Sequence, residues 1–387
     1  MKRIAVFTGT RAEYGLLHPL LKLLKKDDEV DLKLIVTGTH LSPEFGLTYK
    51  QIEEDGFNID EKIEVLLSSD TATGVAKSVG LAVISYSDAL TRLDAEMIII
   101  LGDRYEALAM AQTAMLLRVP IVHLHGGEIT EGAYDDAIRH AITKLSHLHF
   151  ASNEQHRKRI IQLGESPDRV FNVGAIGLDN IFNAPLMSKD ELAKSINFDL
   201  TKPFFLLTYH PVTLASEDPI KSFNTIITAI DSFPHYNVIV TYPNADDGGR
   251  KIISCIEAWA ANAKNKERIK VVPSLGFKRY LSAVKYSSTV IGNSSSGVIE
   301  VPSLNVSSVN IGERQKGRIS APSVLHCPVD KQQIIEAIQN SIEITDELKA
   351  GTKTVKNPYG NGDTSKKIVE LLKITSPDIQ KKFFDID

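Results

Sequence analysis

The sequence predicts an α/β protein whose parallel sheets belong to two domains. Short apolar runs alternate with longer amphipathic stretches along the chain, which is typical of βα units with covering helices. At roughly 100–200 residues per domain, 387 residues correspond to two or three domains. The two halves also resemble each other, 4–11 matching 204–211, 34–40 matching 238–244 and 97–103 matching 289–293. This similarity predicts a duplicated pair of Rossmann-like domains.

The apolar runs are the expected strands. In the first half they lie at 3–8, 32–37, 97–101, 120–124, 148–151 and 170–173, and in the second half at 204–208, 237–241, 270–272, 289–292, 307–311 and 324–327. Apolar residues at helical spacing predict helices over 13–26 and 218–231. We expect a first domain over 1–182, a linker over 182–202 and a second domain over 203–363. A final helix at 364–373 and the tail to 387 are expected to pack back towards the first domain. Within the linker, Ser188 and Glu191 form a capping-box pattern that opens a helix.

Composition excludes several classes of protein. The chain carries 44 basic and 48 acidic residues, a net charge of −4, and nucleic-acid-binding proteins usually have a strongly basic face. Its two cysteines form no CxxC pair or metal-ligand spacing, so a disulfide scaffold and a metal site are not expected. No apolar run approaches the roughly 20 residues that span a bilayer. We therefore expect a cytoplasmic protein that binds a small molecule, with neither nucleic acid nor membrane as a partner.

Polar side chains with chemical potential follow the expected strands. These clusters lie at 8–11, 37–40, 102–104, 123–128, 208–211, 243–244, 293–297 and 312–318. In open α/β sheets, ligands bind beyond the carboxyl ends of the strands. We therefore expect polar groups from both halves to meet in a cleft between the domains.

The first half is rich in acids at these positions. Asp103 follows a buried strand, where it either works as a desolvated general acid or base or simply caps the next helix or pairs with Arg104. His125 and Glu128 flank Gly126-Gly127, a turn that lets backbone approach a ligand closely. Asp135 and Asp136 begin the next helix with Arg139 one turn on, a pattern also typical of an ordinary helix start and ion pair. Together these acids suit proton transfer at carbon.

The second half carries anion-binding features. The loop 293–297 opens a helix, so its serines and amides either hold a diphosphate, closed by Arg314 or Arg318, or form an ordinary N-cap. Glu300 either accepts ribose hydroxyls or lies exposed on that helix, and His210 either donates to a phosphate or is structural. No GxGxxG motif is present, which argues against a dinucleotide cofactor.

With these motifs, the chain resembles the hydrolysing UDP-N-acetylglucosamine 2-epimerases, specifically the branch that starts sialic acid and related nonulosonic acid synthesis. The motifs are GTRAEYG at 9–15, LGDRYE at 101–106, HLHGGE at 123–128, DDAIRHAITKLSH at 135–147, TYHPVT at 208–213, GNSSSGVIE at 292–300, NIGERQKGR at 310–318 and NPYG at 357–360. The resemblance implies a GT-B fold, a homodimer and no metal or redox cofactor. It implies anti elimination of UDP through 2-acetamidoglucal, followed by addition of water to give N-acetylmannosamine.

The strand-end positions and the resemblance together predict the residues of the site. The expected catalytic residues are Asp103, His125, Glu128, Asp135 and Asp136. The expected substrate-binding residues are Arg11, His40, Arg104, Arg139, His210, Asn244, Ser294, Ser295, Glu300 and Arg318, with Ser294, Ser295 and Arg318 on phosphates, His210 on the diphosphate side and Glu300 on ribose. Epimerases outside this branch commonly carry a catalytic Glu where this chain has His125. Either His125 takes the proton role, or Glu128 and the Asp135/Asp136 pair do.

Other functions fit the same residues. The substrate is either UDP-N-acetylglucosamine or its 2,4-diacetamido-2,4,6-trideoxy analogue of the legionaminic acid route. A GT-B glycosyltransferase uses the same two-domain arrangement, and a non-catalytic nucleotide-sugar sensor is a third reading, against which the carboxylate set argues.

Overall fold

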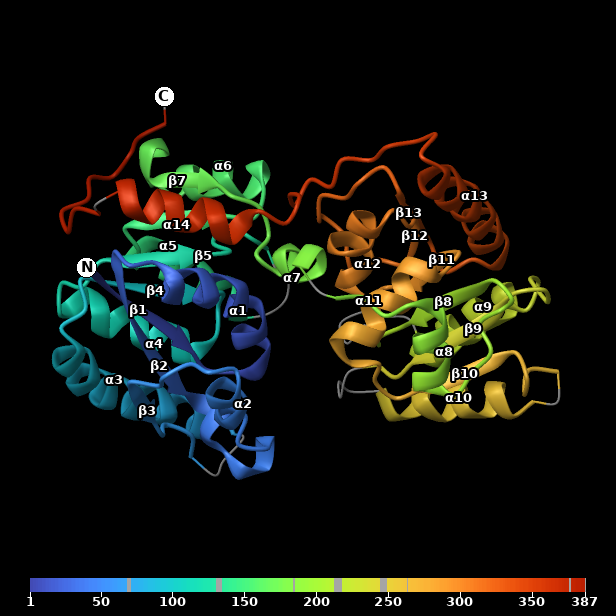
Figure 1. The fold of residues 1–387 in the computed structure, drawn as a ribbon, viewed down its shortest axis with the longest axis horizontal. Helices are drawn as coiled ribbons and strands as arrows, with labels where there is room; N and C mark the ends of the chain where they lie inside the picture. The colour runs from blue at the N-terminus through green and yellow to red at the C-terminus, as the bar shows by residue number, and fades with distance from the viewer. Residues whose placement is uncertain are drawn as a thin grey trace. The chain divides into compact units, whose positions relative to one another are not determined.

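The computed structural model divides the chain into two compact units (Figure 1). Unit 1 comprises Met1–Asn180 together with Tyr359–Asp387, and unit 2 comprises Ile181–Pro358. The structure describes residues 1–67, 71–129, 134–183, 185–211, 218–243, 249–262, 264–375 and 377–386. No helix within these residues is long and apolar enough to cross a membrane.

Unit 1 is built on a parallel seven-stranded sheet with the order β3-β2-β1-β4-β5-β6-β7. Its strands are β1 (Lys2–Thr8), β2 (Val30–Thr37), β3 (Glu61–Ile63), β4 (Met97–Leu101), β5 (Ile121–Leu124), β6 (Leu148–Ala151) and β7 (Val170–Asn172). Its helices are α1 (Arg11–Lys26), α2 (Tyr49–Glu54), α3 (Ala72–Leu93), α4 (Tyr105–Leu116), α5 (Tyr134–Leu145), α6 (Glu154–Gln162) and α14 (Thr364–Ile374), with 3-10 turns η1 (Gly38–Leu41), η2 (Pro43–Phe45) and η3 (Pro167–Arg169). Helix α7 (Gly177–Asn183) spans the division between the units.

Unit 2 repeats this plan with six parallel strands in the order β10-β9-β8-β11-β12-β13. Its strands are β8 (Phe204–Thr208), β9 (Asn237–Thr241), β10 (Ile269–Val272), β11 (Thr289–Gly292), β12 (Ser308–Ile311) and β13 (Val324–Cys327). Its helices are α8 (Lys189–Ile196), α9 (Pro219–Ile230), α10 (Gly249–Ala261), α11 (Gly276–Tyr286), α12 (Ser295–Ile299) and α13 (Lys331–Ala350), with the 3-10 turn η4 (Val301–Leu304). The matching central order, in which the first strand lies between the second and the fourth, is the doubly wound arrangement.

Each sheet is covered on both faces because its strands alternate apolar side chains between two cores. In β1, Ile4 and Val6 join a core with α1 and α14, whereas Ala5 and Phe7 join a core with α3, α4 and α5. In β8, Phe205 and Leu207 pack towards α9, α10 and α13, while the alternate residues pack towards α8 and α11. Successive side chains of a strand point to opposite faces, so continuous apolar runs are the expected pattern of a sheet buried on both sides.

The predicted strands are confirmed, each within two residues of its expected bounds, and so is the capping box of Ser188 with Glu191. The sequence did not reveal β3, because Glu61–Ile63 is a three-residue edge strand without an apolar run. Helix α1 begins two residues earlier than expected, at Arg11, because Thr10 and Glu13 form a second capping box.

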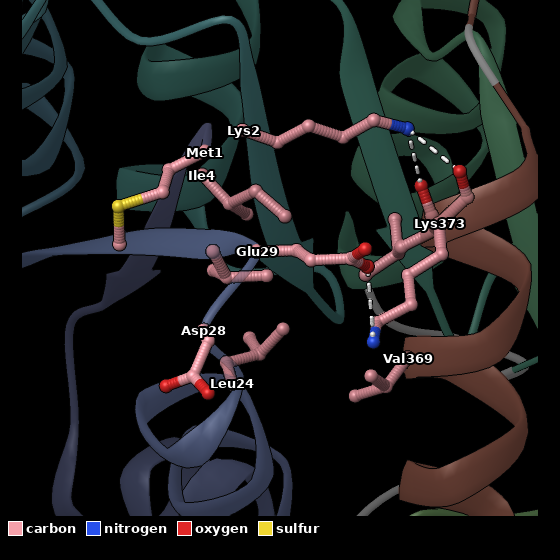
Figure 2. A pocket seen from close by; sticks show the side chains of 10 residues that line it. Met1, Lys2, Ile4, Leu24, Asp28, Glu29, Val369 and Lys373 are labelled. Carbon is pink, nitrogen blue, oxygen red and sulfur yellow. Dashed lines mark hydrogen bonds and ion pairs between the residues drawn. The ribbon is translucent and has the colours of Figure 1, made fainter.

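Helix α14 belongs to unit 1 although it comes almost at the end of the chain (Figure 1). Ile368 and Leu372 are buried in the same core as the leucines of α1. Figure 2 shows a pocket that is lined by residues of β1, α1 and α14. Its volume is about 480 Å³. The Lys2 ammonium donates to the carbonyls of Leu372 (3.0 Å) and Lys373 (2.9 Å), capping the helix end. Lys373 in turn pairs with Asp27 (2.6 Å) and Glu29 (3.2 Å).

The tail after α14 also contacts unit 1. Lys381 donates to both carboxylate oxygens of Glu165 at 2.9 Å and to the carbonyls of Lys144 (2.6 Å) and Ser146 (2.8 Å). Glu165 is buried and also contacts the His149 ring (3.1 Å). Burial raises the pKa of Glu165, but these donors outweigh it and lower the pKa to about 2. The backbone N–H of Phe384 donates to the carbonyl of Gly164 (3.0 Å), so the tail contacts the loop that joins α6 to β7.

We predict that Leu372→Ala destabilises unit 1 by about 2–5 kcal/mol, because a buried leucine truncated to alanine loses its packing and leaves a cavity. Denaturant unfolding, followed separately for the two units, measures it. Lys366→Ala on the exposed side of α14 is the matched control and should change stability by less than about 0.5 kcal/mol. Equal effects of the two variants would contradict the buried placement of Leu372.

The ion pairs of Glu165 with Lys144 and Lys381 predict that the stability of the fold depends on pH. A carboxylate whose pKa is lower in the folded than in the unfolded state stabilises the fold above its unfolded pKa, and this contribution disappears as pH falls towards the folded pKa. With a shift from 4.5 to about 2, wild type should exceed Glu165→Gln by about 3 kcal/mol at neutral pH, and the gap should close between pH 4.5 and 2. Unfolding free energies across this range measure it, with the exposed Glu154→Gln as control. A gap that does not change with pH would contradict the ion pairing.

Candidate active site

A pocket of about 350 Å³ lies at the carboxyl ends of the strands of unit 1. Its lining comes from the loops after β1, β4 and β5 and from the starts of the following helices. The lining residues are Thr10, Ala12, Glu13, Leu16, Leu101, Gly102, Asp103, Arg104, Tyr105, His125, Glu128, Asp135 and Arg139. The pocket therefore gathers four of the five expected catalytic residues, together with Arg104 and Arg139.

Arg139 connects the loops that form this pocket. Its side chain is only 7% exposed on α5, and its guanidinium donates to the Asp103 carboxylate after β4 and to the backbone carbonyl of Glu128 after β5 (2.9 Å). A longer contact of 3.5 Å reaches Asp136. A buried guanidinium is always charged and needs such acceptors. Its interactions thus determine where the carboxylates lie.

Asp103 is positioned by the end of β4. Gly102 adopts φ +79°, a conformation that favours glycine, and its carbonyl accepts a hydrogen bond from the buried His123 ring at 2.8 Å. Burial raises the pKa of Asp103, and the nearby Asp135 and Glu128 raise it further, against the opposing effect of Arg139. Asp103 therefore holds a proton more readily than a free aspartate.

Glu128 has the opposite surroundings. Its Oε1 accepts a hydrogen bond from the Ser152 hydroxyl (2.7 Å) and lies 3.3 Å from His125 Nδ1. Burial raises the pKa of Glu128, but His125, His156, Ser152 and Arg139 together outweigh it, and the net pKa lies below the usual value. The pocket thus holds two carboxylates whose pKa values are shifted in opposite directions.

Arg104 lines both this pocket and a larger one. The larger pocket has a volume of about 1470 Å³, and residues of the loops after β2 and β3 line it. The buried Glu106 accepts two hydrogen bonds from the Arg104 guanidinium (3.3 and 3.4 Å). Glu13 holds the loop after β1 by accepting from the backbone N–H groups of Gly9 (2.7 Å) and Thr10 (3.1 Å). Burial raises the pKa of Glu13 to about 7.

The remaining expected residues of unit 1 lie in different surroundings. Arg11 is exposed and lines the larger pocket. His40 is fully buried, with Nε2 3.1 Å from the Thr8 hydroxyl and Nδ1 2.8 Å from that of Thr48. Burial lowers the pKa of His40 to about 4, so it supports the loop as a neutral ring. Asp136 turns to Arg139 and His140 (3.7 Å) and is not part of the pocket lining.

In unit 2, the loop after β11 is held by the side chain of Asn293. Its Oδ1 accepts from the His210 backbone N–H (2.7 Å) and its Nδ2 donates to the His210 carbonyl (2.8 Å). Its own carbonyl accepts from Arg314 (3.1 Å) and Gln315 (2.9 Å). These bonds bring the strand-end loops after β8, β11 and β12 together.

Ser294 is the residue before α12, and its side chain does not cap the helix. Ser295 and Arg318 are partly exposed in the same group of loops. Glu300 accepts a hydrogen bond from the Ser296 hydroxyl, which accepts one from Tyr280 (2.8 Å), and burial raises the pKa of Glu300. Asn244 lies outside the described residues. Among the described residues, no cluster of His, Cys, Asp and Glu could hold a metal ion.

The sequence did not single out four residues that shape the site. Ser152 follows β6 as the other candidates follow their strands, so its position was a usable signal. His156, Glu13 and Glu106 lie inside helices, where a polar residue is most often exposed, and only the tertiary structure shows that they are buried.

Comparisons with known proteins agree with this architecture. The family model of UDP-N-acetylglucosamine 2-epimerase matches residues 22–373. The GDP/UDP-N,N'-diacetylbacillosamine 2-epimerase (hydrolyzing) of Campylobacter jejuni is 41% identical over 88% of this chain and 88% of its own. The polysialic acid biosynthesis protein P7 of Escherichia coli is 37% identical over 100% of this chain and 98% of its own.

Solved structures show the fold. The UDP-GlcNAc 2-epimerase of Neisseria meningitidis, bound to UDP-GlcNAc, superposes with a TM-score of 0.77 and 19% identity, covering 97% of this chain and 100% of that one. The two doubly wound units therefore form a GT-B-like two-domain fold. The chain is an enzyme and belongs to the UDP-N-acetylglucosamine 2-epimerase family.

Proposed function

We propose that the protein is a hydrolysing UDP-N-acetylglucosamine 2-epimerase that releases N-acetylmannosamine and UDP. The observation that carries the proposal is the pocket of unit 1, which is lined by Asp103, Glu128, Asp135 and Arg139. The family match and the names of the relatives support the reaction class.

Inversion at C2 explains the need for several acids. Anti elimination removes the C2 proton from one face of the sugar, and inversion returns a proton to the other face. One fixed group cannot reach both faces, so the reaction needs at least two acid–base groups near C2. Asp103 and Glu128 line one pocket and have oppositely shifted pKa values, an arrangement that suits a proton donor and a proton acceptor.

The loops of unit 2 are proposed to bind the UDP group. Ser294, Ser295 and Arg318 offer hydroxyl, amide and guanidinium donors to the diphosphate, and such charge-assisted hydrogen bonds stabilise the charge that develops as UDP departs. His210 lies with them on the diphosphate side. Glu300, beside Tyr280 and Ser296, is proposed to accept the ribose hydroxyls.

A second sugar is a specific alternative. The Campylobacter jejuni relative is named for diacetylbacillosamine, so UDP-2,4-diacetamido-2,4,6-trideoxyglucose is the competing substrate.

The proposal includes a cytoplasmic homodimer. This part of the proposal rests on the resemblance to the epimerase family.

Incubation in heavy water tests the reaction. With UDP-N-acetylglucosamine, or with the diacetamido analogue in a parallel reaction, we expect release of UDP and one deuterium at C2 of the free sugar. Nuclear magnetic resonance of the product measures both, and the ratio of kcat/KM for the two substrates decides between them. Sugar release without deuterium at C2 would contradict the proposal, and strict dependence on an added acceptor would indicate a glycosyltransferase.

Substitutions should separate catalysis from UDP binding. Asp103→Asn should lower kcat by about 100-fold or more, the usual contribution of a general acid or base, with UDP affinity within about twofold of wild type. Arg318→Ala should instead weaken UDP binding by about tenfold or more, because a hydrogen bond from a charged group contributes about 1.5–3 kcal/mol.

Calorimetric titration with UDP and steady-state kinetics measure these effects. Lys316→Ala, exposed on the same loop and paired with Glu313, is the control for Arg318, and the exposed Asp88→Asn is the control for Asp103. Full activity of Asp103→Asn would remove Asp103 from the catalytic set.

A further inference from the structure

We infer that Glu128 is the base that removes the C2 proton and that His125 is a positioning residue for its carboxylate. The inference rests on the proposed function. It assigns one step within the reaction: the C2–H electrons form the C1=C2 double bond, the C1–O bond breaks with its electrons on the departing UDP, and the proton moves to Glu128.

The hydrogen bond that the His125 ring accepts leaves no lone pair for a substrate proton. Nε2 lies 3.3 Å from the backbone N–H of Ile176 and can only accept from it. A neutral imidazole that accepts at one nitrogen carries its proton on the other, so Nδ1 is the donor. Nδ1 lies 3.3 Å from Glu128 Oε1. The ring therefore directs its N–H nitrogen towards Glu128 Oε1, and acting as a base would require the contact with Ile176 to break.

The backbone holds His125 in this orientation. Its φ is +63°, which is uncommon for a residue with a side chain, and its N–H donates to the Phe150 carbonyl on β6 (3.0 Å). Two residues on, Gly127 has φ +75°, and a Cβ there would lie 2.4 Å from the His156 carbonyl. A turn fixed at both ends keeps the ring between Ile176 and Glu128. Backbone strain of this kind is often retained at functional sites.

The contacts of Glu128 leave one oxygen for substrate. Ser152 and His125 both contact Oε1, and among the described residues Oε2 has no hydrogen-bond partner while the side chain lines the pocket. Ser152 is itself fixed, because His156 Nδ1 lies 2.8 Å from its hydroxyl. His156 can donate to Ser152, and Ser152 can then donate to Glu128. These donors favour the ionised carboxylate, the form that a base requires.

Charged groups from several elements face Glu128. His156 and Arg159 approach from α6, Arg139 from α5 and Asp103 from the loop after β4. His125 is the one that lies in the same turn as Glu128. Removing the His125 donor should therefore raise the pKa of Glu128, whereas the other groups stay in place.

The test compares Glu128→Gln, His125→Ala and His125→Gln by C2 deuterium incorporation, kcat, KM and the pH profile of kcat. Glu128→Gln should lower turnover and C2 exchange by about 100-fold or more. His125→Ala should lower kcat by about tenfold, leave KM within about twofold and move the acidic limb of the profile to higher pH. His125→Gln, which restores an N–H donor, should recover part of both losses.

Two further variants keep the test interpretable. Ser152→Ala removes the other donor to Oε1 and should move the acidic limb in the same direction. His147→Gln replaces a histidine that accepts from the Ile121 backbone outside the pocket and should leave the limb unchanged. Circular dichroism and thermal unfolding confirm that each variant is folded.

Loss of the acidic limb in His125→Ala, or its movement to lower pH, would show that His125 itself titrates as the base and would overturn the inference. Retained C2 exchange in Glu128→Gln would overturn it as well. Failure of the proposed function is distinguishable, because wild type itself would then place no deuterium at C2.

Discussion

The candidate site depends on one buried cation. Arg139 lies on α5 and binds the Asp103 carboxylate, the Asp136 carboxylate and the Glu128 backbone, so a single guanidinium connects the loops after β4 and β5. Carboxylates gathered in a partly buried pocket repel one another and lose hydration, and a paired charge is needed to keep them there. Replacing this cation would leave Asp103 without its ion pair while the repulsion from Asp135 and Glu128 remained. The charge that α5 supplies therefore helps to keep several acids together in this pocket.

The surroundings of the two carboxylates give them different chemistry. Asp103 has burial and two neighbouring acids on one side and Arg139 on the other, and its pKa is raised. Glu128 has donors on its Oε1 and cationic or potentially cationic groups around it, and its pKa is lowered. The pKa of Glu128 is lowered by neighbours that include His125, His156 and Ser152, and these side chains do not need to touch substrate themselves. A reaction that takes a proton from one face of a carbon and returns one to the other requires such unequal partners.

The candidate residues of the pocket can be predicted from the sequence, but most of the contacts that support them cannot. Apolar runs predicted the strands, and the rule that ligands lie beyond their carboxyl ends led to Asp103, His125 and Glu128, which the structure places in one pocket. The same rule pointed to His40, but two threonine hydroxyls engage its ring and burial keeps it neutral. Position after a strand cannot show which way a side chain points. Nor can it reveal Glu106 or His156, since a polar residue on a helix is recognised as buried only when the packing around it is known.

The two units share one topology but carry different side chains at the ends of their strands. In each sheet the first strand lies beside the fourth, and the loops after three adjacent strands carry most of the candidate residues: β1, β4 and β5 in unit 1, and β8, β11 and β12 in unit 2. In unit 1 these loops lead into acids held by Arg139, whereas in unit 2 Asn293 joins loops rich in serine and arginine. Parallel strands fix where the loops meet, but they leave the side chains free to differ. The duplicated fold thus supplies the position of each half-site, and the loop residues make one rich in carboxylates and the other rich in hydroxyl and guanidinium donors.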